Sequence, residues 1–239
     1  MERCGLEHDR RFVLVGSDGR FVTQRELGVL AQTRVRVEGD RVVVSAAGRA
    51  PLSLPAAPAA GERVRVRVWE DDSEGLLVPE GGPWFSELAG VPLSLVYMPA
   101  DVQRPVDDRY GEPGDRVSFA DGFPLLLVSQ ASLDLLSERS GRPVEMRRFR
   151  PNLVVTGTPP HAEDGWRRFR IGDLGFRAVK PCSRCVITTR DPDTGVAGKE
   201  PLAELARYRL QDGKVMFGMN VIPDREGEIA VGDPVEVFG

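Results

Sequence analysis

This 239-residue sequence has few cysteines and only short apolar runs, and it has no excess of positive charge. Its three cysteines, Cys4, Cys182 and Cys185, are too few for a disulfide framework and fit a reducing compartment. The longest apolar runs, such as 124–128, are far shorter than the roughly 20 residues of a membrane-spanning helix. Residues 1–9 have no apolar core of the kind that a secretory signal needs. We therefore expect a cytoplasmic protein with no membrane partner.

The charge balance argues against a large class of partners. The net charge is −4, whereas binding to nucleic acid requires an excess of lysine and arginine that neutralises phosphates. We expect no nucleic acid as a partner, although local clusters of arginine leave a small anionic ligand open. With 41% hydrophobic, 28% charged and only 7% aromatic residues, the composition is that of a globular protein.

The first hundred residues alternate in a way that predicts β-hairpins. Apolar runs at 12–15 and 21–23 flank turn residues, and the two arms of 35–44 carry valines at alternate positions. Arginine and valine alternate through 63–68, which places the arginines on one face of a strand. A short helix is expected at 84–88. These elements predict a small, barrel-like β domain.

A polar segment rich in proline and glycine, 98–116, predicts a linker or loop between two domains, 1–97 and 117–239. The second domain is expected to begin with a buried strand at 125–128 and a helix capped by Ser129 or Ser132. Short strands with few helices predict a mainly β (α+β) fold built from barrels rather than from repeated β-α-β units. The further strands are expected at 153–155, 169–171, 176–179, 186–189, 215–221 and 234–238.

The segment that contains Cys182 and Cys185 has the most candidate metal-binding or redox residues close together. A C-x-x-C pair can be half of a zinc site, a dithiol redox pair or two structural cysteines. Zinc needs four ligands, and the rest of the chain supplies only one cysteine and two histidines. A thioredoxin-like pair lies between a strand and a helix, whereas Cys185 begins a β-branched run that we predict to be a strand. Arg184 and Lys180 favour a thiolate at either cysteine.

A second cluster places three arginines at 147–150 before Pro151 and Asn152. Such a run is commonly a solvated strand edge. Alternatively, Arg150 binds an anion, because its planar guanidinium matches phosphate oxygens, and Asn152 offers amide groups to a heterocycle.

Together the two clusters resemble the MOSC domain, which is named for the C-terminal domain of molybdenum cofactor sulfurase. Arg-Phe-Arg-Pro-Asn at 148–152 is followed, 35 residues after Arg150, by Cys185 of Cys-Ser-Arg-Cys, and then by Thr-Thr and Asp-Pro-Asp-Thr-Gly. The first half resembles the β-barrel domain that precedes MOSC in YcbX-type bacterial proteins and in the mitochondrial amidoxime reducing component. The resemblance makes 1–97 a MOSC N-terminal β-barrel domain and 117–239 a MOSC β-barrel domain. Further matching segments are 119–124, 129–133, 199–202, 217–218 and 231–235.

What the resemblance implies is a molybdenum cofactor of the molybdopterin type, with Cys185 as the protein thiolate on the metal. Cys182 is then a structural support. The implied reaction is the reduction of small N-hydroxylated compounds, such as amidoximes and hydroxylamines, with the substrate oxygen passed to molybdenum. Electrons are expected from a separate donor of the ferredoxin, flavodoxin or cytochrome type. The residues that match cofactor-holding positions are Arg10, Asp121, Gly122, Phe123, Arg150, Pro151 and Asn152.

Two departures from the family pattern qualify this reading. Family members begin with a strand whose lysine and serine bind the cofactor phosphate, and YcbX-type proteins carry a C-terminal iron–sulfur domain. We expect neither this strand nor an iron–sulfur domain in the 239 residues. Without the strand we expect weaker cofactor retention, and without the domain we expect no resident electron carrier. Two other functions stay open: a sulfur carrier that relays a persulfide on Cys185, and a cofactor-binding module without reductase activity.

Overall fold

Antiparallel strands build the first part of the chain, as the alternating sequence predicts. The structure, a computed structural model, describes residues 1–238. One sheet has the strand order β2-β1-β8-β7-β6, and a bridge between Arg20 and Arg67 brings its two edges together. A second sheet has the order β3-β4-β5. The strands are β1 (Phe12–Val15), β2 (Phe21–Val22), β3 (Arg34–Glu38), β4 (Arg41–Ser45), β5 (Leu52–Pro55), β6 (Arg63–Val68), β7 (Asp71–Val78) and β8 (Ser94–Tyr97).

Alternation along these strands separates a buried face from a charged face. On β6, Val66 and Val68 are buried while all three arginines are exposed, which confirms the prediction from the sequence. The predicted pairing within 35–44 is also confirmed, since Val35 lies opposite Val44. Helix α1 (Gly81–Ala89) begins three residues before the predicted start and packs against β8, β5 and the 3-10 helix η1 (Gly28–Gln32).

A third and larger sheet is formed by the strands after β8. Its strand order is β10-β9-β14-β12-β11-β15, and β13 pairs with β14. The pairs are antiparallel except β9 with β10, which are parallel and are connected through α2 (Gln130–Ser140). The fold is therefore mainly β with a few helices, as predicted, and it contains a β-α-β connection that the sequence analysis did not expect. The strands are β9 (Leu125–Ser129), β10 (Leu153–Val155), β11 (Arg168–Ile171), β12 (Leu174–Ser183), β13 (Leu210–Gln211), β14 (Lys214–Pro223) and β15 (Val235–Val237).

Strand β9 is buried on both faces and organises two cores. Leu125 and Leu127 belong to a core formed with β11, β12 and β14, whereas Leu126 and Val128 face a core under the helices. A strand without a solvated face needs a continuous apolar run, which explains why this segment does not alternate. Ser129 ends the strand and caps α2, because its side chain accepts a hydrogen bond from the backbone of the third following residue.

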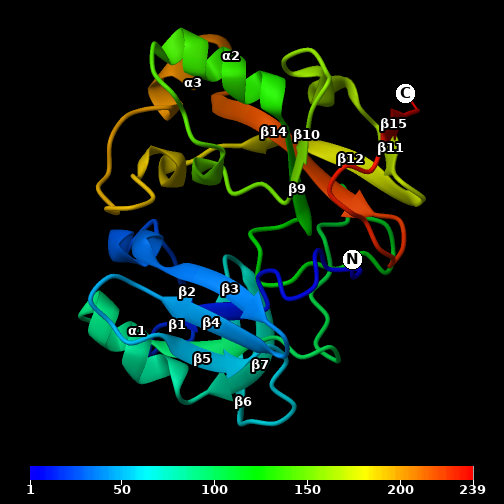
Figure 1. Ribbon diagram of the computed structural model, residues 1–239. Coiled ribbons are helices and arrows are strands. Elements are labelled where there is room, and N and C mark those ends of the chain that lie inside the picture. The colour runs from blue at the N-terminus through cyan, green and yellow to red at the C-terminus, as the bar shows by residue number, and fades with distance from the viewer. Residues whose placement is uncertain (239) are drawn as a thin grey trace. The chain divides into compact units, whose positions relative to one another are not determined.

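The helices of this unit are short and gather on one side of the sheet. Figure 1 shows α2 and α3 (Leu202–Tyr208) together on one face of the sheet that contains β9 and β14. The 3-10 helices are η2 (Met146–Arg148), η3 (Ala162–Gly165) and η4 (Val186–Thr189). Within residues 1–238, no helix has the length and apolar character that crossing a membrane requires.

The chain forms two compact units that are not continuous in sequence. We call them the N-terminal unit, which contains His8–Arg104 and Arg190–Val196, and the C-terminal unit, which contains Met1–Glu7, Pro105–Thr189 and the residues from Ala197 onward. The segment 98–116 is irregular, as predicted, and is divided between the two units at 104/105. The domain bounds expected from the sequence stay a prediction.

The strand predicted at 186–189 is wrong, since these residues form η4. Strand β12 ends at Ser183, and the last backbone bond toward β14 is donated by Arg184 to Val215 at 2.7 Å. Beyond that point Thr188 donates its amide and its hydroxyl to the carbonyl of Cys185, at 3.2 and 3.0 Å. Threonine hydroxyls that bond backward in this way give the chain a local alternative to a strand.

Candidate functional site

The two cysteines of the C-x-x-C pair lie in different local environments. Cys182 is still within β12 and packs against the apolar core that contains Phe149 and Phe217. Cys185 follows the strand, in the turn that leads into η4, and its thiol is half-buried and free of any disulfide. Strand geometry therefore directs the first sulfur toward the core and leaves the second in the loop.

Arg184 connects the cysteine pair to the arginine cluster. Its Nη1 donates to Cys182 Sγ at 3.1 Å, and its Nη2 donates to the carbonyl of Phe149 at 2.8 Å. The guanidinium carbon also lies 5.3 Å from the centre of the Phe149 ring. The structure thus brings together the two motifs that the sequence places 35 residues apart. Sequence reasoning assigned Arg184 only a charge effect on the thiols and missed this connection.

Arg150 follows Phe149 and has an unusual backbone conformation. Its φ is +54°, in the left-handed region that side chains other than glycine adopt infrequently, and its side chain is exposed. Phe149 is buried and lies 4.4 Å from the ring of Phe217 on β14, so the residue before Arg150 is firmly held. A strained residue beside a buried anchor is a frequent feature of ligand-binding loops.

Asn152 has a structural partner in β9. Its backbone amide donates to the carbonyl of Leu126 at 2.9 Å, and its Oδ1 accepts from the amide of Leu126 at 3.0 Å. These two bonds fix the entry to β10, and Pro151 lies directly between Arg150 and this anchor. The carboxamide oxygen therefore already serves the fold, which the sequence did not indicate.

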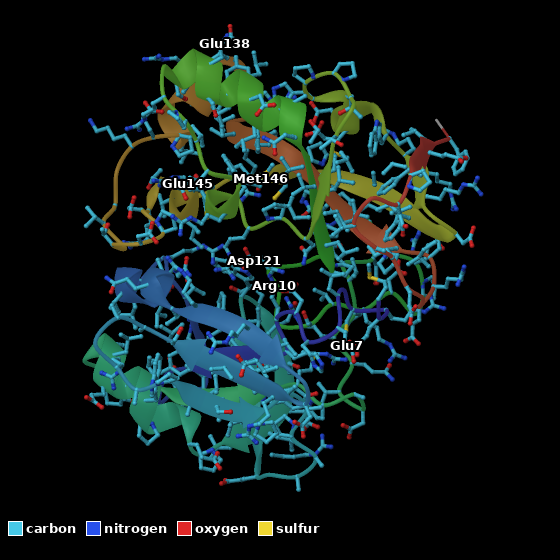
Figure 2. All side chains as sticks on the ribbon, viewed as in Figure 1. Glu7, Arg10, Asp121, Glu138, Glu145 and Met146 are labelled. Carbon is cyan, nitrogen blue, oxygen red and sulfur yellow. The ribbon has the colours of Figure 1, made fainter. Side chains whose placement is uncertain are left out.

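The arginine cluster begins in η2, which packs against the core that α2 and α3 cover. Met146 at its start packs against the core below α2, and Figure 2 labels it there together with Glu145. Arg147 forms an ion pair with Glu145 and is exposed. The first arginine of the cluster is thus a solvated surface residue, in agreement with the simpler interpretation of the run.

The loop that contains Asp121, Gly122 and Phe123 precedes β9. Asp121 is exposed, and a side chain at Gly122 would meet no atom within 4 Å. Phe123 packs edge-on against Tyr110 with ring centres 5.8 Å apart. Because Lys180 Nζ of β12 lies 4.5 Å from the centre of the Tyr110 ring, this aromatic pair links the loop to the strand that carries Cys182.

Two cations lie over the ring of Tyr110. Besides Lys180, Arg109 has its guanidinium carbon 5.7 Å from the ring centre, and it hydrogen-bonds to Asp107. Those bonds lower the pKa of Asp107 to about 2, with a smaller contribution from the charge of Lys180. The carboxylate therefore stays ionised at all physiological pH values.

Arg10 is the predicted site residue of the N-terminal unit. It has a φ of +51° and forms a partly buried ion pair with Asp9 (Arg10 is labelled in Figure 2). The other predicted residues, Asp121 to Phe123, Arg150 to Asn152 and Cys185, all belong to the C-terminal unit.

The segment after η4 is anchored within the N-terminal unit. Gln32 donates to the carbonyl of Thr194 at 2.8 Å, and Arg34 forms an ion pair with Asp193. Arg190 donates to the carbonyl of Arg25 at 2.8 Å. The Asp-Pro-Asp-Thr-Gly motif is therefore held by side chains that lie more than 150 residues earlier in the chain.

The fold and these motifs define a class of protein, and comparison with known families identifies it. Residues 114–236 match the MOSC domain, and residues 1–92 match the MOSC N-terminal beta barrel domain. The chain therefore belongs to the MOSC family and combines both domains, as the motifs predicted.

Several named proteins are similar to this chain over nearly its whole length. It is 35% identical to mitochondrial amidoxime-reducing component 1 of Homo sapiens, across 99% of this chain and 75% of the human protein. It is 34% identical to mitochondrial amidoxime reducing component 2 of Rattus norvegicus, across 98% of this chain and 74% of the rat protein. Molybdenum cofactor sulfurase of Oryza sativa subsp. japonica is 32% identical across 94% of this chain but only 30% of the rice protein. These similarities assign the chain a function related to the molybdenum cofactor.

Proposed function

We propose that this protein is a molybdenum-cofactor-dependent reductase of N-hydroxylated compounds that receives its electrons from a separate protein. The observation that carries the proposal is the 35% identity to an amidoxime-reducing component across 99% of the chain, with a free, half-buried thiol at Cys185. The substrate gains two electrons and two protons and releases its hydroxyl oxygen as water.

The donor set in the C-terminal unit fits a molybdenum–pterin group. Cys185 offers a soft thiolate, and thiolates suit soft metals, whereas the first sulfur of the pair is already occupied by Arg184 and the core. Arg150 offers an exposed guanidinium to the phosphate of the cofactor. We assign the remaining contacts of this unit to Pro151, Asn152 and the loop at 121–123, while the role of Arg10 stays a prediction from the resemblance.

When bound, the molybdenum centre supplies the redox chemistry, and the chain supplies binding, orientation and electrostatics. Cys185, placed after the end of β12, would hold the metal as a thiolate. The charge of Lys180, which lies over the Tyr110 ring, favours anionic groups near the loop at 121–123. Electrons come from a ferredoxin, flavodoxin or cytochrome type of donor.

The first test combines metal analysis with turnover. Protein from a host that makes the cofactor is analysed for molybdenum and pterin, and is then assayed for benzamidoxime reduction with an artificial electron donor. We expect stoichiometric molybdenum and turnover with that donor, but none with NADH alone. Absence of molybdenum from folded protein would refute the proposal.

The cysteine pair provides a matched control in the same experiment. Cys185→Ser replaces a soft ligand with a hydroxyl that is hard to deprotonate, so activity should be lost even where pterin stays bound. Cys182→Ser removes a sulfur that packs against the core, so we expect a loss of about 1–2 kcal/mol in stability with activity partly kept. Equal loss of activity in both folded variants would contradict the assignment of Cys185 as the metal ligand.

A sulfur carrier is the second candidate, and the similarity to the rice molybdenum cofactor sulfurase favours it. In that case the Cys185 thiolate takes the outer sulfur of a persulfide on a donor protein, whose cysteine leaves as a thiolate, and Cys185 holds no metal. Mass spectrometry of the purified protein separates the two functions. A persulfide on Cys185 in metal-free protein supports the carrier, whereas stoichiometric molybdenum supports the reductase.

A further inference from the structure

Arg184 is placed where the sheet releases the chain toward Cys185. Its backbone amide donates to the carbonyl of Val215 at 2.7 Å, which is the last bond between this segment and β14. The next residue, Cys185, has left the strand and begins the turn into η4. The side chain of Arg184 therefore lies at the point where the chain leaves the sheet and the turn toward η4 begins.

The guanidinium group makes two directional contacts at once. Nη1 donates to Cys182 Sγ and Nη2 donates to the carbonyl of Phe149, at 3.1 and 2.8 Å. The group also lies over the Phe149 ring, which is 1% exposed. A planar, forked donor can hold two acceptors in a fixed relative geometry, which the single point charge of a lysine cannot do.

The contact between Arg184 and the Phe149 carbonyl joins two residues that each directly precede a proposed cofactor residue. Phe149 is followed directly by Arg150, and Arg184 is followed directly by Cys185. The carbonyl of Phe149 belongs to the peptide unit directly before Arg150, whose backbone is in the left-handed region. One side chain thus joins the backbone that presents the thiol to the backbone that presents the guanidinium.

We propose that Arg184 is a positioning residue that sets the geometry between Cys185 and Arg150, so that both can hold one cofactor. The proposal rests on the proposed function, because it requires that these two residues bind the same group. Partners that orient metal ligands without touching the metal commonly change metal affinity about 10–100-fold when they are removed. We expect a loss of cofactor affinity within that range when the guanidinium group of Arg184 is removed.

Arg184→Gln and Arg184→Lys test this role against Arg147→Gln as a matched control. Arg147 belongs to the same cluster, but it is exposed and ion-paired to Glu145. We expect cofactor retention after dialysis to fall about 10-fold or more in Arg184→Gln, and to be unchanged in the control. Arg184→Lys should recover only part of the retention, since its ammonium group cannot hold both acceptors.

Hydrogen exchange of the cofactor-free protein supplies a readout that does not depend on the proposed function. In Arg184→Gln, amides at 149–152 and 184–189 should exchange faster together, while those of β9 and β14 stay protected. Faster exchange throughout the C-terminal unit would mean a purely structural role and would overturn the proposal. Unchanged exchange at both segments, or full recovery of retention with lysine, would overturn it as well. If the wild-type protein bound no molybdenum, the proposed function would fail, while the exchange result would still decide whether Arg184 couples the two segments.

Discussion

The buried ion cluster around Arg177 on β12 gives the sharpest test of the stability of the C-terminal unit. Arg177 and Asp115 are 8% and 6% exposed, and they form a paired contact with Nη2 to Oδ1 at 2.7 Å and Nη1 to Oδ2 at 3.0 Å. Asp224 accepts a third bond, from Nε at 3.1 Å. These bonds raise the pKa of Arg177 above its ordinary value, with Asp115 as the main cause. The contact holds the loop that precedes residues 121–123 against β12.

Arg177→Met removes all three bonds and leaves Asp115 as a buried charge. The carboxylate then keeps only the backbone amide of Glu112, which donates to its Oδ2 at 2.6 Å. Breaking a buried pair by removing one partner costs about 3–5 kcal/mol, so we expect a loss in that range. Asp115→Asn should cost less, about 1–3 kcal/mol, because Arg177 keeps its bond to Asp224.

The assay is urea unfolding followed by tryptophan fluorescence. Of the three tryptophans, Trp166 is the one that lies in the C-terminal unit, and it is buried. A Trp69→Phe, Trp84→Phe background therefore reports the unit that contains the ion cluster. The double variant Arg177→Met, Asp115→Leu should lose less than the sum of the losses of Arg177→Met and Asp115→Leu measured singly, by about 2 kcal/mol. A loss below about 1 kcal/mol for Arg177→Met, with additive behaviour of the double variant, would refute the reasoning.

Two further predictions concern a half-buried histidine and a close approach of two glycines. Burial lowers the pKa of His161 below its ordinary value of 6.5, so the stability given by its neutral ring is complete above that pH and declines as the pH falls. His161→Phe should remove this decline from the unfolding free energy that Trp166 fluorescence reports between pH 7.5 and 5, and parallel pH profiles of variant and wild type would contradict it. Gly195→Ala places a Cβ against the carbonyl of Gly28 at a φ of +72°, whereas Gly48→Ala has a similar φ of +73° and open space. Thermal unfolding should show a loss of about 1–2 kcal/mol for Gly48→Ala from the backbone alone and a larger loss for Gly195→Ala, while equal losses would mean that the close approach has no energetic effect.

The sequence by itself determined the elements whose patterns are local. Alternation of arginine and valine at 63–68 identified a strand with one buried face, because successive side chains point to opposite sides. A serine before an apolar run identified the start of α2, because a hydroxyl can satisfy a free amide of the first turn. Spaced motifs around Arg150 and Cys185 identified the family, which the comparisons confirm.

Only the tertiary structure decided how distant segments meet. The β-branched run at 186–189 forms a 3-10 helix because its threonines bond backward after β12 ends, and no local count of β-formers contains that information. The motif at 191–195 packs within the N-terminal unit because Gln32 and Arg34 reach it there. The contact of Arg184 with the Phe149 carbonyl has the same origin, since it depends on how the end of β12 and the segment before β10 meet in the fold and not on periodicity along the chain.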